Sequence, residues 1–205
     1  MLQSFELKEL FKNPGISFLI KFILLFILFY VGTQVVIGLS AEVGWYSPFI
    51  AKYFNYIAWL RTSILYGGHV AASIIGLKTI IRPPFLLQIV NGPAVKMVYS
   101  CIGIGIMSFW AAFVLANTAR FLKRFLWTLG GLTLIWFINC WRLAILLYTL
   151  EKNGNINKFA EHHNLFNAIC YLVVFIMIYF FTKKPSGSRQ TTVSNKLLPD
   201  QNNSL

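Results

Sequence analysis

The sequence has little of the charge that keeps a soluble domain in water. Only 12% of its 205 residues are Asp, Glu, Lys or Arg, against roughly 25% in soluble domains. What it has instead is 57% hydrophobic and 17% aromatic residues, with a mean hydropathy of +0.65. One soluble core of this length cannot bury so much apolar surface, whereas a bilayer accepts helices that are apolar on every side. We therefore predict an all-α integral membrane protein.

Acidic residues and cysteines are the scarcest of the chemically active types. The 6 Asp and Glu stand against 18 Lys and Arg, which gives a formal net charge of +12. The basic residues are scattered among apolar segments and form no dense aromatic-interleaved stripe, so we expect no nucleic-acid partner. Three cysteines without CxxC spacing exclude a disulfide framework and a zinc site.

Long apolar runs predict a bundle of about four transmembrane helices, because a span needs ~20 residues. The predicted spans cover about 16–39, 101–119, 125–150 and 165–181. A polar loop at 151–164 separates the last two. Together they make residues 1–182 one transmembrane domain. The polar remainder, 183–205, is predicted to be a disordered cytoplasmic tail.

Residues 45–80 are apolar but do not form a simple span. Arg61 divides them into two stretches, each shorter than the ~17 residues that crossing needs. The region is rich in Trp and Tyr, which prefer the headgroup level of a bilayer. We interpret it as interfacial or re-entrant helices, with a tightly packed pair of short spans as the alternative.

Residues 81–100 have the pattern of a β-hairpin. Pro83-Pro84 forbids a continuous helix. Asn91-Gly92 lies between the β-prone runs FLLQIV and AVKMVY, and both residues accept the positive φ of a tight turn. Lipid does not tolerate unpaired backbone. We therefore expect a short extracytoplasmic hairpin lying in water against the membrane face.

Basic clusters set the expected orientation. One lies at 120–124, as a short loop after the second span, and another begins at Lys183, after the fourth. Both should be cytoplasmic by the positive-inside rule. This topology places Cys101, Arg142 and the pair His162-His163 together at the outer membrane face, although they belong to three separate segments.

These three residue types are the parts of cysteine-based acyl transfer. Cys101 is predicted to begin the second span, where the positive end of the helix dipole favours the nucleophilic thiolate. A neighbouring His can act as base and later protonate a leaving amine. Arg142 can offer fixed donors to the oxyanion of a tetrahedral intermediate.

Each of these residues also has a structural interpretation. Cys101 alone would be a small packing residue, Arg142 alone could neutralise the negative end of its helix, and the His pair alone could belong to a solvated loop. Cys140 and Cys170 lie within predicted spans and are interpreted as inert. The conjunction at one membrane face favours catalysis over the separate structural roles.

The order of these motifs resembles the exosortase/archaeosortase family of membrane-embedded cysteine transpeptidases. The resemblance rests on VYSCIGI at 98–104, NCWRL at 139–143 and HHNLFN at 162–167, and it covers roughly residues 80–180. Members often have Ser where this chain has Ile102, and Gly where it has Asn167. His163 is the preferred match for the family's His, because Phe166 then falls three residues on; His162 is the runner-up. The short chain resembles a compact bacterial subgroup.

The resemblance implies a function and a location. The chain would cleave C-terminal sorting signals of secreted proteins at the outer face of the bacterial cytoplasmic (inner) membrane, which it would cross several times. Cys101 would form the acyl-enzyme, His163 would serve as acid and base, and Arg142 would stabilise the oxyanion. No metal and no organic cofactor would be needed. The partners would be secreted proteins with a C-terminal transmembrane signal, the lipid bilayer, and an acceptor amine on a glycan or lipid, or water.

Two other functions stay open at this point. The chain could be a non-catalytic scaffold or assembly protein of a surface-polysaccharide or secretion system, in which Arg142 and the His pair are structural. A small transporter or channel is a weaker candidate than either of these, because it would need ionisable groups deep in its spans. In this sequence Lys21 and Arg142 lie near span ends.

Overall fold

The computed structural model describes residues 13–41, 45–153 and 157–183; for Ser100, Asn153 and 157–165 it describes the backbone alone. This part of the chain is mostly helical, with one small sheet. The helices are α2 (Pro14–Ser40), α3 (Pro48–Tyr53), α4 (Tyr56–Ile74), the 3-10 turn η1 (Tyr99–Cys101), α5 (Ile104–Ala116), α6 (Phe121–Asn153) and α7 (Asn157–Thr182). The strands are β1 (Thr79–Arg82), β2 (Leu86–Ile89) and β3 (Ala94–Lys96).

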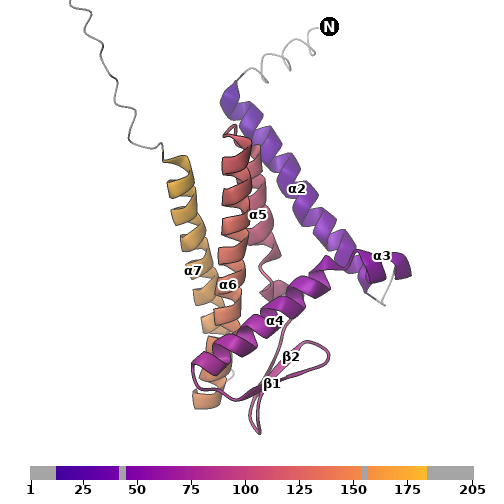
Figure 1. The fold of residues 1–205 in the computed structure, drawn as a ribbon, viewed down its shortest axis with the longest axis vertical. Helices are drawn as coiled ribbons and strands as arrows, with labels where there is room; N and C mark the ends of the chain where they lie inside the picture. The colour runs from indigo at the N-terminus through magenta and orange to yellow at the C-terminus, as the bar shows by residue number, and fades with distance from the viewer. Residues whose placement is uncertain (1–12, 42–44, 154–156, 184–205) are drawn as a thin grey trace, which may run out of the picture.

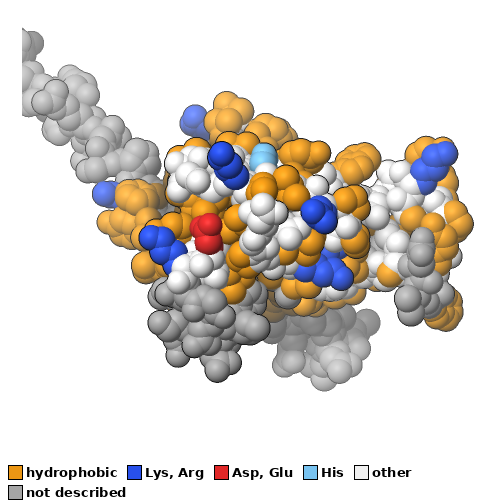
Figure 2. Space-filling model, turned by 90° about the horizontal axis from the view of Figure 1, so that it is seen from below, with side chains coloured by type: hydrophobic (Ala, Val, Ile, Leu, Met, Phe, Trp, Pro, Cys, Tyr) orange, Lys and Arg blue, Asp and Glu red, His pale blue; other side chains and the backbone are white. Residues whose placement is uncertain are grey.

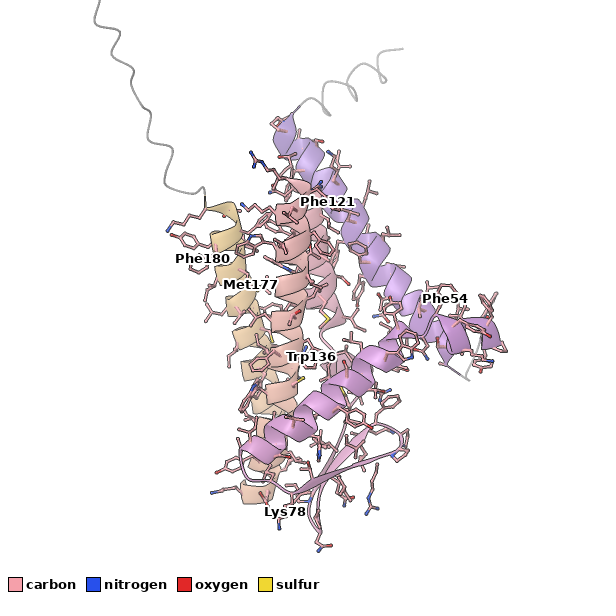
Figure 3. The ribbon with its side chains drawn as sticks, in the orientation of Figure 1. Phe54, Lys78, Phe121, Trp136, Met177 and Phe180 are labelled. Atoms are coloured by element: carbon pink, nitrogen blue, oxygen red, sulfur yellow. The ribbon has the colours of Figure 1, made fainter. Side chains whose placement is uncertain are left out.

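The helices α2, α5, α6 and α7 run between two ends of the molecule (Figure 1). The sheet and α4 lie at the lower end in that view, and α4 crosses α6 obliquely there. The first residues of α2 and the last of α7 lie at the opposite end. Figure 3 marks the two ends by Phe121, at the start of α6, and Lys78, beside the sheet.

Two of the helices are long and apolar enough to cross a membrane: α2, and α6 over Phe121–Lys152. In the most apolar 18-residue stretch of each helix, 6% is buried inside the protein for α2 and 39% for α6. The core helix of a soluble protein would be mostly buried. The prediction of long apolar helices is therefore confirmed for the first and third predicted spans.

The second predicted span is shorter than expected, because α5 has 13 residues. At 1.5 Å per residue it is about 20 Å long, less than the ~30 Å of a bilayer core. Gly103 is left-handed before it, and Asn117 is extended after it, where its side chain accepts the N–H of Ala119. Both ends are thus fixed by local backbone geometry that apolar composition does not reveal.

The helix α7 begins earlier than predicted. The polar sequence at 151–164 was expected to be a loop, but α6 continues to Asn153 and α7 starts at Asn157, so the predicted loop is wrong over most of its length. Polar side chains do not prevent a helix where it lies in water, so composition marks the edge of the apolar segment and not the end of the helix. The predicted tail lies outside the described residues beyond 183.

Residues 45–80 are mostly helical, with α3 and α4, but Arg61 does not divide them. A single 19-residue helix, α4, passes through Arg61, which is buried. Two glycines bring α4 close to α6: a Cβ on Gly68 would lie 2.7 Å from Leu143 Cδ2, and one on Gly67 would overlap Cys140 Sγ. Trp136 of α6 completes the contact by donating from Nε1 to Ser63 Oγ at 3.0 Å (Figure 3).

The predicted hairpin is confirmed and gains a third strand. The strands β2 and β3 are antiparallel, with Leu87 opposite Val95, and Asn91 has the positive φ of 59° that the turn requires. The additional strand β1 pairs antiparallel with β2. Pro83-Pro84, which the sequence identified only as a helix breaker, forms the turn between these two strands.

Aromatic rings join α2 to α5. Phe18, Phe22 and Phe26 lie one turn apart on the same face of α2. Phe18 meets Phe113 edge-on with ring centroids 5.7 Å apart, and Phe22 meets Phe109 in the same way at 5.3 Å. Such pairs contribute about 0.5–1.5 kcal/mol each beyond the area they bury. The packing makes α2 part of the bundle.

Two basic residues of the predicted 120–124 loop lie inside α6 and tie the bundle together. Lys123 Nζ donates to the carbonyl of Phe181 near the end of α7, at 3.0 Å, and Arg124 donates to the carbonyl of Leu115 near the end of α5, at 3.2 Å. The last carbonyls of a helix have no partner within it and carry partial negative charge. Lys123 and Arg124 thus bind carbonyls at the C-terminal ends of α7 and α5.

The face that carries the sheet is basic. Figure 2, which views this end, shows Lys and Arg side chains among hydrophobic ones, with one acidic side chain visible. Lys78, Arg82 and Lys96 are exposed around the sheet. These charges lie at the end that was predicted to face outward.

Candidate active site

Cys101 lies in the connection between the sheet and α5. The chain leaves β3 at Lys96 and makes the single 3-10 turn η1, closed by the Cys101 N–H donating to the carbonyl of Val98 at 3.0 Å. Cys101 is partly exposed and ends this turn. The predicted position is thus corrected: Cys101 precedes the first residue of α5 by three residues, because Gly103 interrupts the helix.

Gly103 takes a backbone conformation that favours glycine. Its φ of 76° is left-handed, and a Cβ there would lie 3.0 Å from Asn139 Nδ2. Asn139, which is buried in α6, donates from this same Nδ2 to the carbonyl of Ile102 at 3.0 Å. The amide therefore holds the backbone immediately after Cys101 against α6, and the glycine leaves room for it.

The structure brings Cys101 and Arg142 to one cavity. This cavity, of about 310 Å³, is lined by Lys96, Cys101, Asn139 and Arg142 together with apolar residues of α4, of β3 and the segment after it, and of α6. Asn139 and Arg142 are three residues apart and share a face of α6. Arg142 is only 7% exposed. A thiol, an amide and a guanidinium from two distant segments thus border the same space.

A larger cavity of about 750 Å³ adjoins the smaller one. Its walls come from α2, η1 and the connection to α5, α5, α6 and α7, and its polar lining residues are Tyr30, Gln34, Tyr99, Asn139, Arg142, Asn167 and Tyr171. Asn139 and Arg142 line both cavities. The pair therefore stands at the boundary between the space beside Cys101 and the space between the long helices.

The third predicted residue, His163, falls where the structure describes the backbone alone, and so does His162. Their side chains lie outside the described residues. The backbone places residue 163 in the second turn of α7. Residue 163 precedes Asn167 by one helical turn and so shares its face of α7, and Asn167 lines the larger cavity with Arg142.

Sequence reasoning missed Arg61 as a residue of this region. Its guanidinium carbon lies 3.8 Å from the ring centre of Phe85 and 4.7 Å from that of Tyr99, and one of its nitrogens donates to the carbonyl of Met97. Burial lowers the pKa of Arg61, and the neighbouring Tyr99 and Cys101 partly oppose that shift. Arg61 therefore fixes, from α4, the segment that leads to Cys101.

A signal for Arg61 was present in the sequence. An ionisable residue with apolar stretches on both sides is a functional-site hypothesis by default. His69 of α4 lies near the same sheet: its Nδ1 is 2.7 Å from Thr79 Oγ1 of β1. That contact joins α4 to the sheet, which agrees with a structural role.

Comparison of the chain with models of protein families, with curated proteins and with solved structures finds no match. Among the described residues, no group of three or more His, Cys, Asp and Glu side chains could hold a metal ion.

Proposed function

We propose that the chain is a membrane-embedded cysteine peptidase or transpeptidase of the exosortase/archaeosortase kind, with Cys101 as nucleophile. The observation that carries the proposal is the cavity of about 310 Å³ that Cys101 and Arg142 line together. If Cys101 were only a packing residue and Arg142 only neutralised the end of its helix, the two would not need to line one cavity. A nucleophile beside a charged donor group is what acyl transfer requires.

A membrane setting is supported by the surface of the helices. Large hydrophobic side chains are exposed along α2, α6 and α7; examples are Leu24, Leu28, Leu126, Leu172 and Phe175. Soluble monomers rarely expose contiguous apolar patches of that extent. We propose a multi-pass protein of the cytoplasmic membrane in which the sheet end, with Cys101, faces the extracytoplasmic side.

In the proposed reaction the thiol proton passes to His163 as the Cys101 sulfur attacks the carbonyl carbon of a peptide bond. The carbonyl oxygen becomes an oxyanion, to which Arg142 donates. The C–N bond then breaks, and His163 returns the proton to the leaving amine. An amine or water attacks the resulting thioester and releases the thiol. The substrate class is a secreted protein with a C-terminal apolar helix, as the family resemblance implies.

The structure also offers a means of keeping the nucleophile in place. Asn139 binds the backbone carbonyl of Ile102, which follows Cys101. Arg61 binds the backbone carbonyl of Met97, which precedes it. A nucleophile held from two helices keeps its geometry during the reaction, and small misplacements of reacting groups are costly. Both residues are positioning residues in this proposal.

The test compares cells that make the wild-type chain, Cys101→Ala or Cys170→Ala in place of their own copy. Mass spectrometry of secreted and membrane proteins identifies the C-termini that are created after synthesis. Cys170 is the matched control, because it is a buried thiol that does not line the smaller cavity.

We expect Cys101→Ala to abolish a set of processed C-termini that Cys170→Ala leaves intact, with the same amount of chain in the membrane. Processing that continues in Cys101→Ala contradicts the proposal. In that case the chain would be a scaffold without catalytic activity, and losses would instead follow removal of exposed aromatics such as Trp59.

A further inference from the structure

The larger cavity has a polar end and an apolar end. Asn139, Arg142 and Asn167 line it near the sheet end of the helices, and toward the other end its lining is apolar: Phe26, Phe109, Val174, Phe175 and Ile178. Along α7 it extends from Asn167 to Ile178, about 16 Å at 1.5 Å per residue. Its volume of about 750 Å³ lies within the range of ~300–1,000 Å³ that is typical of ligand pockets.

Arg142 places a buried positive charge at the polar end. It is 7% exposed, and among the described residues no hydrogen bond or ion pair to its guanidinium is found. The acidic side chain that the structure describes, Glu151, lies nine residues further along α6, about 13 Å away along the axis. A buried charge is unfavourable unless it is paired, so the site is complementary to an anion.

The walls of the cavity indicate how the ligand enters. Two of them, α2 and α7, expose large hydrophobic side chains on their outer sides, including Leu24, Leu28 and Leu172. A ligand that reaches the cavity between such helices comes from an apolar phase. It therefore needs an anionic group and an apolar chain in one molecule.

We propose that this cavity binds an anionic lipid. The guanidinium of Arg142 binds the phosphate of the headgroup, for which its planar donors are suited. Asn139 borders the same end, and the acyl chain lies along Phe109, Val174 and Ile178. A second protein helix fits less well, because an apolar helix brings no anionic group to the guanidinium of Arg142.

The inference does not depend on the proposed acyl transfer. Cys101 lines the smaller cavity and is not among the lining residues of the larger one. Binding is therefore measured on the full-length Cys101→Ala chain, which keeps Arg142. A failure of lipid binding leaves the processing experiment unaffected, and a failure of processing leaves lipid binding unaffected.

The experiment measures the binding of dioleoyl phosphatidylglycerol and dioleoyl phosphatidylcholine to the purified chain by native mass spectrometry. Arg142→Gln removes the charge, and Arg142→Lys retains it. Val174→Trp fills the apolar end from a buried position, while Leu172→Trp, on the exposed side of the same helix, is its matched control. Thermal unfolding in detergent shows which variants are folded.

We expect the anionic lipid to bind at least tenfold more tightly than the zwitterionic one. Arg142→Gln should abolish this preference and Arg142→Lys should keep part of it. Val174→Trp should lose both lipids, and Leu172→Trp neither. Equal binding of the two lipids, an unchanged preference in Arg142→Gln, or an apolar peptide helix found in the cavity instead of lipid would overturn the proposal. If Arg142→Gln does not fold, the lipid preference and the tryptophan pair decide it.

Discussion

Asn139 donates a hydrogen bond of 3.0 Å from Nδ2 to the backbone carbonyl of Ile102. This bond joins the middle of α6 to the residue that follows Cys101. Because Arg142 follows Asn139 by three residues on the same helical face, the bond also sets how the guanidinium meets the cavity beside the thiol. The geometry of the candidate site thus depends on one amide.

Asn139→Ala should lower stability and loosen the segment that carries Cys101. It leaves the buried carbonyl of Ile102 without its partner, which costs about 1–3 kcal/mol. Thermal unfolding in detergent measures the first effect. The rate at which a maleimide modifies Cys101 in the folded chain measures the second. An unchanged rate would show that the amide does not position the thiol.

Gly103→Ala should destabilise the chain more than Gly105→Ala does. At Gly103 the left-handed φ of 76° costs a side chain about 1–2 kcal/mol, and the new Cβ meets Asn139 Nδ2 at 3.0 Å. At Gly105 the nearest atom would be Tyr30 Cε2 at 3.8 Å, an ordinary contact. Unfolding of the two variants side by side checks the difference, and equal stability would refute this account of the turn.

Gly131→Ala should disrupt the packing of α6 against α5 and α7, whereas Gly130→Ala should not. A Cβ on Gly131 would overlap both Trp110 Nε1 and Met177 Cε, while one on Gly130 meets nothing within 4 Å. Overpacking costs about 1–3 kcal/mol. Ala is preferred to Gly inside a helix by about 1 kcal/mol, so Gly130→Ala should be neutral or slightly stabilising. Denaturant midpoints in detergent distinguish the pair.

Arg61→Met should destabilise the link between α4 and the segment before Cys101. Met fills part of the space between Phe85 and Tyr99 but leaves the carbonyl of Met97 unpaired, at about 1–3 kcal/mol. Lys52→Met, at an exposed cation of α3, is the control and should have no measurable effect. If both variants unfold at the same temperature, Arg61 does not support the site.

The sequence predicted those features that depend on local patterns. The apolar run of α2 and the Asn91-Gly92 turn follow from composition and backbone preference, and both are confirmed. The expected order of the helices placed Cys101 and Arg142 at the same end of the bundle, and in the structure both line the smaller cavity. Short-range rules suffice where one residue type or one run decides the conformation.

Other features depend on contacts that no local pattern contains. The burial of Arg61 needs the rings of Phe85 and Tyr99, which come from a turn and from η1. The early start of α7 could not be predicted, because polar residues suit a loop and a hydrated helix equally well. The interruption at Gly103 becomes meaningful only with Asn139 beside it.

The most direct test of the account is modification of the three thiols by a membrane-impermeant maleimide added to intact cells. We expect Cys101 to react from outside and the buried Cys140 and Cys170 not to react while the chain is folded. We also expect His163→Ala to slow the reaction of Cys101. Modification of Cys101 only after the cytoplasmic side has been opened, or at a rate that His163→Ala leaves unchanged, would contradict the account.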